Sequence, residues 1–187
     1  MNKRKRTFLL IALAVVVVGC LMISPVAKAS NTAGEDSKEV SQLLNDMKMR
    51  AHQLELDAAE METFARTRLS ETSHAAQLNQ IGEHINKAGE LLRRLHDARE
   101  TGSAWQQKAI DEIYPLLKEL AENTDTAMKF FNENKPRADM SPDYKEYLKE
   151  NSSMASELAT LIADYVDYGF HKSQFERLGE KLVASER

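Results

Sequence analysis

The stretch VSQLLNDMKMRAHQLELDAAEMETFA, residues 40–65, repeats its apolar side chains every seven positions. Two such lines run side by side, made of Val40, Met47, Leu54 and Met61 and of Leu44, Ala51, Ala58 and Ala65. Sevenfold spacing gathers apolar side chains on one face of a helix, and that face packs lengthwise against other helices. The small alanines also let a neighbouring helix approach closely. The stretch therefore predicts a long helix that begins at about Ser37 and belongs to a helical bundle.

The same spacing returns in the next two segments. A turn at residues 66–69 precedes a second helix, for which Ser70 is the expected N-cap. Ser103, with Gln106 three residues later, predicts the start of a third helix that continues as one bent helix through Pro115. The apolar lines of these two helices are Leu78, Ile85 and Leu92; Ile81, Ala88 and Leu95; Ile110, Leu117, Thr124 and Phe131; and Ile113, Leu120 and Ala127.

A fourth helix is expected to start at Ser141-Pro142, an N-cap followed by proline at the first helical position. It carries a wide apolar face made of Leu148, Ala155, Ile162, Leu158, Tyr165, Tyr147, Met154, Leu161 and Tyr168. Gly169 predicts its end. Ser173 and Glu176 then predict the cap of a short fifth helix with Phe175, Leu178, Leu182 and Val183. The predicted fold is all-α, an antiparallel up-down-up-down four-helix bundle with a short fifth C-terminal helix over residues 37–187.

The N-terminus has the pattern of an export signal. A basic cluster, MNKRKR, precedes an apolar run over residues 8–23 and an A-x-A site at Ala27–Ala29, which predicts a signal peptide over residues 1–29. Residues 30–36 are small and polar and are expected to form a disordered lead-in. Two alternatives remain open: Val17-Val18-Gly19-Cys20 resembles a bacterial lipobox that would lipidate Cys20, and the run would otherwise serve as an uncleaved anchor. All three place the folded part outside the cytoplasm, in the bacterial periplasm or secreted.

Charge and cysteine content exclude several classes of function. Residues 1–29 contain five of the 25 basic residues and none of the 29 acidic ones, so the remaining chain has a net charge of −9. Nucleic acids and anionic lipids bind basic faces, and neither is an expected partner. Cys20 is the single cysteine and precedes the predicted domain, which therefore contains no disulfide, no thiolate nucleophile and no covalent haem motif.

The stretch ETSHAAQLNQIGEH, residues 71–84, raises the question of a metal site. Di-iron bundles use two Glu-x-x-His motifs, and Glu71-x-x-His74 is the only one here. His171 is not level with the core methionines, which argues against haem. His74 is instead expected in the end layer beside Ala65, Phe131 and Tyr144, hydrogen-bonded to a tyrosine hydroxyl or a turn backbone group, with a pH-sensitive role as the alternative. No catalytic, metal-binding or cofactor-binding residue is assigned, and no cofactor is expected.

Two polar residues interrupt the apolar lines at one level of the bundle. Thr124 on the third helix and Asn151 on the fourth are expected to form a buried hydrogen bond that fixes the helix register. The alternative is that they form the floor of a small ligand cavity beside Pro115.

Two apolar surfaces exceed what a four-helix core requires. Met49 and Leu56 form a stripe on the outer side of the first helix, and the fourth helix has its wide face. The fifth helix is expected to cover one of these surfaces, since single exposed apolar residues are common. The alternative is that the stripe is a docking surface for another protein.

The sequence does not specify a biochemical activity. It contains no Gly-rich phosphate loop, no G-x-S-x-G and no H-E-x-x-H. The leading hypothesis is an exported, non-enzymatic bundle that acts by contact with an unknown envelope or periplasmic protein. Membrane contact is expected only through a retained or lipidated N-terminal segment. The alternative is a periplasmic bundle that binds a small ligand or cofactor through His74, Thr124, Asn151 and the tyrosines.

Overall fold

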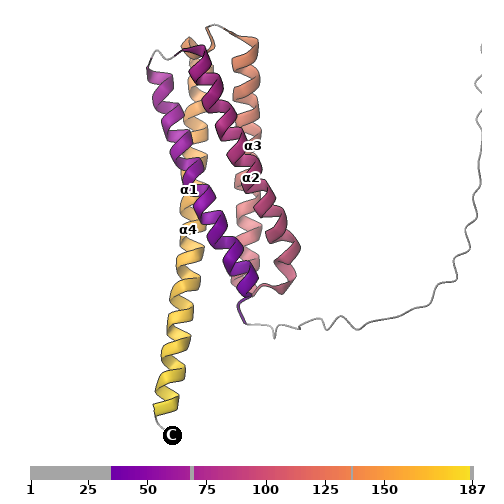
Figure 1. Ribbon diagram of the computed structural model, residues 1–187, viewed down its shortest axis with the longest axis vertical. Coiled ribbons are helices and arrows are strands. Elements are labelled where there is room, and N and C mark those ends of the chain that lie inside the picture. The colour runs from indigo at the N-terminus through magenta and orange to yellow at the C-terminus, as the bar shows by residue number, and fades with distance from the viewer. Residues whose placement is uncertain (1–34, 68–69, 136, 186–187) are drawn as a thin grey trace, which may run out of the picture.

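The computed structural model describes residues 35–185, apart from 68–69 and 136, and contains four main helices with no strand in that part of the chain. They are α1 (Lys38–Arg66), α2 (Glu71–Ala98), α3 (Ala104–Glu133) and α4 (Pro142–Ser185), shown in Figure 1. Short 3-10 turns at Arg99–Thr101 and Ala138–Met140 precede α3 and α4. The all-helical fold is confirmed. The predicted signal peptide and residues 30–34 of the lead-in lie outside the described residues.

The predicted starts of the first three helices are confirmed by capping contacts, and α4 begins at Pro142 as predicted. The Ser37 hydroxyl accepts the backbone N–H of Val40 at 3.4 Å, and the Ser70 hydroxyl accepts that of Ser73 at 3.2 Å. Ser103 and Gln106 form the expected capping box. These side chains satisfy N–H groups that the first helical turn leaves unpaired.

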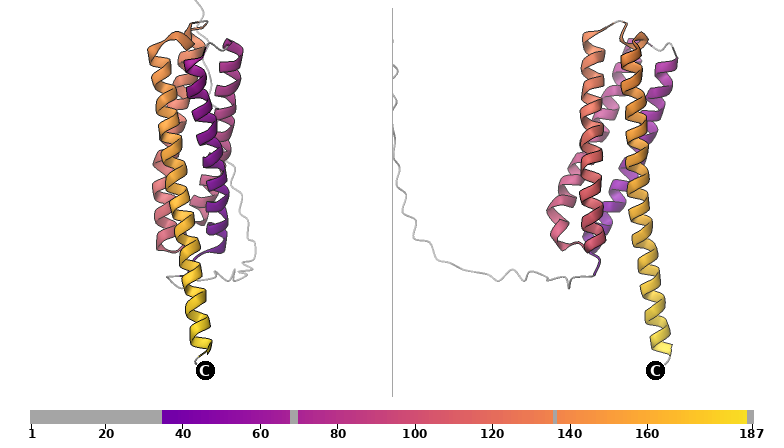
Figure 2. Two further views of the ribbon diagram at one scale, coloured as in Figure 1. Left: turned by 90° about the vertical axis from the view of Figure 1, so that its left-hand side faces the viewer. Right: turned by 180° about the vertical axis from the view of Figure 1, so that it is seen from behind.

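The apolar lines of the sequence form the core. Every residue of the two α1 lines is buried, as are the predicted lines of α2 and α3. α3 is a single helix that includes Pro115, so the prediction of one helix rather than two is confirmed. α1 packs against α2 and α4, and α3 packs against the same two helices, which gives the bundle-like arrangement of Figures 1 and 2.

The predicted end of the fourth helix at Gly169 is wrong, and so is the separate fifth helix. α4 runs without interruption for 44 residues, about 66 Å at 1.5 Å per residue, whereas α1, α2 and α3 have 28 to 30 residues. Ser173 caps no new helix, because its hydroxyl donates to the carbonyl of Phe170 at 2.8 Å within the same helix. α4 therefore projects beyond the other three helices (Figures 1 and 2).

A packing contact explains the glycine that suggested a helix end. A Cβ built on Gly169 would lie 2.7 Å from Cη2 of Trp105, closer than real Cβ contacts allow. The glycine is thus needed for the approach of the indole ring and does not mark a left-handed turn. Helices tolerate an internal glycine at a cost of roughly 1 kcal/mol relative to alanine.

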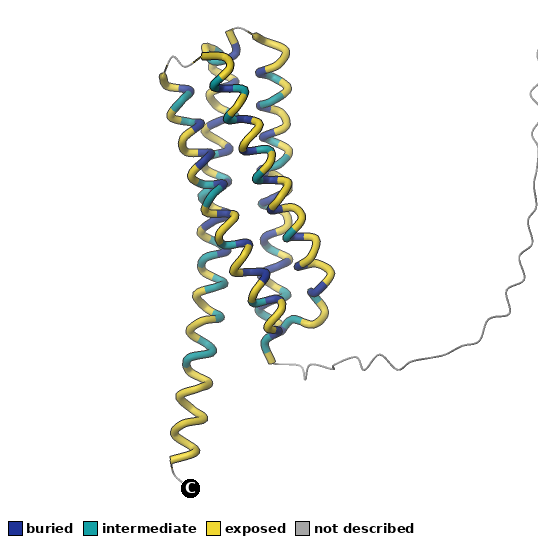
Figure 3. Tube along the Cα trace, viewed as in Figure 1, coloured by how far each residue is buried: buried dark blue, intermediate teal, exposed yellow. Residues whose placement is uncertain are grey.

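Residues 168–185, here termed the α4 extension, lie outside the core. Ile162 is the last buried residue of α4 among the described positions, and Figure 3 shows the mainly exposed helix that follows. Six of the ten large exposed apolar residues of the described chain belong to this extension, namely Tyr168, Phe170, Phe175, Leu178, Leu182 and Val183. The extension is therefore the principal concentration of uncovered apolar side chains in the described structure.

Candidate functional site

His74 lies in an aromatic layer at one end of the bundle, as predicted. Its ring centroid is 6.1 Å from that of Phe131 and 6.0 Å from that of Tyr144, and the histidine is fully buried. The expected hydrogen bond is absent, however. Neither ring nitrogen of His74 has a hydrogen-bond partner among the described residues, and the same holds for the hydroxyl of Tyr144. The layer is filled by ring packing rather than by polar contacts.

Burial determines the charge state of this layer. Desolvation lowers the pKa of His74 from its ordinary value, and the nearby Asp139 offsets this effect only in part. Desolvation also raises the pKa of the Tyr144 hydroxyl, with a further contribution from Asp139. Both side chains are therefore neutral near pH 7.

The Glu71-x-x-His74 motif does not assemble a metal site. Glu71 is exposed and pairs with Lys135 at 3.6 Å, whereas His74 points into the aromatic layer. Within the described ranges, no group of three or more His, Cys, Asp or Glu side chains is arranged to hold a metal ion.

The predicted pairing of Thr124 with Asn151 is confirmed. The Thr124 hydroxyl lies 3.2 Å from Oδ1 of Asn151, and both residues are buried. Asn123 adds a second donor to the same oxygen at 3.0 Å. The surface depression that Thr124 lines, about 460 Å³ between α2 and α3, includes neither Asn151 nor a tyrosine. The pair thus joins α3 to α4 and does not form the floor of an enclosed cavity there.

A second buried polar cluster was not anticipated. Asp57 on α1 is buried and accepts hydrogen bonds from Gln53 at 2.9 Å and Gln80 at 3.0 Å, and its other oxygen contacts Nδ1 of His84. The sequence signal for its burial was weak, since the sevenfold line of Asp57 contains the apolar Leu43 and Phe64 but also the exposed Arg50. Each oxygen of this carboxylate has a partner, so the cluster joins α1 to α2 as a satisfied buried network.

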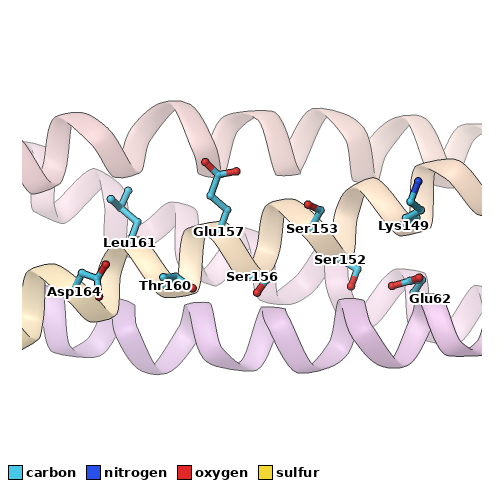
Figure 4. Close-up of a pocket in the computed structure, with 9 residues that line it drawn as sticks. All are labelled: Glu62, Lys149, Ser152, Ser153, Ser156, Glu157, Thr160, Leu161 and Asp164. Atoms are coloured by element: carbon cyan, nitrogen blue, oxygen red, sulfur yellow. The ribbon is translucent and has the colours of Figure 1, made fainter.

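A depression on the outer side of α4 shows no arrangement of side chains that indicates a ligand. Figure 4 shows its lining, with short side chains such as Ser152, Ser156 and Thr160 along α4 and Glu62 contributed by α1. Its volume is about 670 Å³, and the hydroxyl of Ser156 donates to Glu55 at 2.9 Å. Such a surface by itself indicates no ligand.

The root of the α4 extension is fixed by a polar network. The carboxylate of Asp36 accepts hydrogen bonds from Ser103 at 2.7 Å, from the Trp105 indole at 2.6 Å and from Lys172 at 3.1 Å. Burial alone would raise the pKa of Asp36, but these three donors outweigh it and hold the pKa below its ordinary value. The start of α1, the start of α3 and the root of the extension are therefore joined at one point.

Gln106 strengthens the same end of the molecule. This fully buried amide accepts the backbone N–H of Ser37 at 2.9 Å and donates to the Ser37 carbonyl at 2.9 Å. It also donates to the Ser41 hydroxyl at 2.9 Å. The sequence identified Gln106 as a helix cap but gave no sign that it binds α1.

Four of the six large exposed apolar residues of the extension occupy one face. Tyr168, Phe175 and Leu182 follow each other at sevenfold spacing, and Leu178 lies between the last two. At 100° per residue these side chains fall within an arc of roughly 80°, as in a helix that packs against another helix. Because this face is apolar, exposed and fixed at its root, we take the α4 extension as the candidate functional site.

The other predicted apolar surface is also uncovered. Met49 is 71% exposed and Leu56 is 51% exposed, so the expectation that a fifth helix covers this stripe or the α4 face is wrong. The stripe consists of two separate side chains, whereas the extension has a continuous face. None of the described helices is both long and apolar enough to cross a membrane.

Comparisons with known proteins give no match. No family model matches the chain, and neither the curated proteins nor the solved structures contain a significant relative.

Proposed function

We propose that this protein is an exported, non-enzymatic helical bundle that acts by protein–protein contact in the cell envelope, and that the α4 extension is its docking surface. The proposal includes the antiparallel up-down-up-down topology and a signal peptide over residues 1–29. The supporting observation is the exposed apolar face of Tyr168, Phe175, Leu178 and Leu182. The root of this helix is fixed by the contacts of Lys172 with Asp36 and of Tyr168 with Trp105. Exposed apolar faces of this kind characterise interaction sites.

The arrangement favours contact with a helix. The face follows sevenfold spacing, and an amphipathic helix recognises such a face through side chains at matching positions. The rigid root reduces the entropy lost on binding, because the extension is already helical and already directed away from the bundle.

A photo-crosslinking residue in the full chain tests this proposal in cells. Placed at position 178, on the apolar face, it should give a strong crosslinked protein product. The matched control is position 118 on α3, where Lys118 is exposed and far from the extension in sequence. Equal yields at the two positions would contradict a docking role for the extension.

The export part of the proposal has its own test. Intact-mass measurement of the chain from its native cells should give the mass expected for cleavage after Ala29. A mass increased by acyl chains on Cys20, or the mass of the uncut chain, would replace that cleavage by lipidation or by retention of an anchor.

A further inference from the structure

We propose that the α4 extension pairs with the α4 extension of a second copy of this chain, in antiparallel orientation, to give a dimer with one bundle at each end. This inference rests on the proposed function, because it names the partner of the same surface.

The exposed face continues an interface that exists within the bundle. Tyr147, Met154 and Leu161 precede Tyr168, Phe175 and Leu182 on a single line with sevenfold spacing. The first three are partly buried against the core. Tyr147 meets Phe130 of α3 at a ring distance of 5.8 Å, and Tyr168 meets Trp105 at the start of α3 at 5.5 Å. The apolar line of α4 is thus in contact with α3 as far as the first turn of α3. Beyond that point the line continues along α4, but α3 no longer covers it.

The missing occupant is therefore a helix that lies where α3 would continue. α3 begins at Ala104, and Trp105 already contacts the root of the extension, so this chain's own α3 cannot fill that position. Figures 1 and 2 show the extension projecting beyond the end of α3. A helix with an apolar sevenfold line of matching length suits the vacant face, and the extension of a second copy has that line.

The position of α3 determines the direction of the pair. A second α4 lying parallel to the first would bring its own bundle alongside, into the space that α3 occupies next to Tyr147. An antiparallel second copy places its bundle at the far end of the paired helices instead. The 18 residues of each extension span about 27 Å, which separates the two bundles.

An antiparallel register pairs the large residues with each other. Setting Phe175 opposite the partner's Leu178 also sets His171 opposite the partner's Leu182, and the same contacts repeat across the twofold axis. At the flanking positions, Lys172 lies beside the partner's Gly179, and Gln174 lies beside the partner's Lys181. No like charges face each other at these flanking positions, so the contact itself adds no local repulsion.

Cysteine crosslinking in the full chain tests both the contact and its direction. In a Cys20→Ser background, which leaves no other cysteine, F175C and L178C chains with tags of different size are mixed and mildly oxidised. The antiparallel dimer predicts a mixed F175C–L178C disulfide in clear excess over either single-variant product. Predominant F175C–F175C and L178C–L178C products would indicate a parallel pair and overturn the proposed orientation.

Sedimentation of the full chain measures the association itself. The interface of two short helices lies at the small end of specific interfaces, so a dissociation constant on the order of micromolar is expected. L178E should raise that constant about tenfold or more, because it puts a charge at the centre of the apolar contact. The matched control, L56E, places the same charge on an exposed leucine of α1 and should leave the constant unchanged. Equal effects of the two variants, or a chain that stays monomeric at 100 times the expected constant, would overturn the dimer.

The tests separate this inference from the proposed function. A crosslink from position 178 whose mass equals two copies of the chain supports both. A crosslink to a different protein, with a monomeric chain in sedimentation, overturns the dimer and leaves the docking surface in place. Absence of any product at position 178 above the position-118 control overturns both.

Discussion

The two parts of α4 carry the same pattern and have opposite environments. Residues 142–167 pack along the bundle and bury Leu148, Leu158 and Ile162, whereas residues 168–185 continue the sevenfold spacing with Phe175, Leu178 and Leu182 exposed. The periodicity records which face of a helix is apolar. It does not record whether the neighbour that covers this face belongs to the same chain. Matched substitutions in the two parts of α4 test this difference.

The largest difference is expected between two leucines of α4. Leu158 is fully buried and Leu178 is 55% exposed. Leu158→Ala should lower the free energy of unfolding by about 2–5 kcal/mol, since it removes buried methyl groups and leaves a cavity. Leu178→Ala should change it by less than about 0.5 kcal/mol when the chain is dilute enough to be monomeric. Urea titrations measure both, and comparable losses would mean that the extension is packed against its own bundle.

Two glycines of α4 give the next contrast. Gly169→Ala should cost about 1–2 kcal/mol, because overpacking against Trp105 outweighs the better helix propensity of alanine. Trp105 is the only tryptophan, so a change in its fluorescence should accompany the loss. Gly179→Ala should instead stabilise the chain by roughly 0.5–1 kcal/mol, since no described atom lies within 4 Å of the added Cβ. A neutral Gly169→Ala with unchanged fluorescence would contradict the close indole contact.

The difference in stability loss should be smaller for two polar side chains, Asn151 in the core and Ser173 in the extension. Asn151→Leu should lower the free energy of unfolding by about 1–2 kcal/mol, because Thr124 and Asn123 lose the oxygen that they share. Ser173→Ala in the extension removes only an exposed bond to the Phe170 carbonyl and should change the stability by less than about 0.5 kcal/mol. A urea melt in which Asn151→Leu is neutral would show that the buried pair contributes no stability.

The smallest expected effect is a pH dependence of stability that arises from the buried His74. The folded chain holds the pKa of His74 below the ordinary value of 6.5, so the unfolded chain binds more protons as the pH falls below 6.5. Stability is therefore complete above about pH 6.5 and declines as the pH falls toward the folded pKa. His74→Phe should reduce the decline in Tm between pH 7.5 and 5.5. His171→Phe, at a position of the extension that is exposed in the single chain, should leave the decline as in the original chain when the chain is dilute enough to be monomeric.

Most of the bundle could be predicted because its determinants are local. Ser37, Ser70 and Ser103 cap helices through contacts three residues away, and sevenfold lines define the buried faces without knowledge of the neighbours. Counting helical turns away from the short connections was also sufficient to predict that His74 lies next to Phe131 and Thr124 next to Asn151.

The failures involve contacts between residues distant in sequence. Gly169 has the local properties of a helix end, and only the approach of Trp105, 64 positions earlier, explains it as an interior residue. Asp57 has the local properties of a solvated residue until Gln80 and His84 of α2 surround its carboxylate. The sequence also predicted a hydrogen bond for His74 that the structure lacks. The neighbouring rings fill the space around its imidazole but offer no partner to either ring nitrogen.

The hydrogen bonds of Asp36 and Gln106 at the start of α1 have a mechanical consequence. A tensile load applied along the chain toward residue 35 would reach the Ser37–Gln106 amide pair and the Asp36 contacts with Trp105 and Lys172 before it could strip α1 from its neighbours. Strain would spread to α3 and α4 at once, and rupture would require several bonds to break together. A bundle that is held at the N-terminal end of α1 would therefore resist stepwise unfolding of that helix under load.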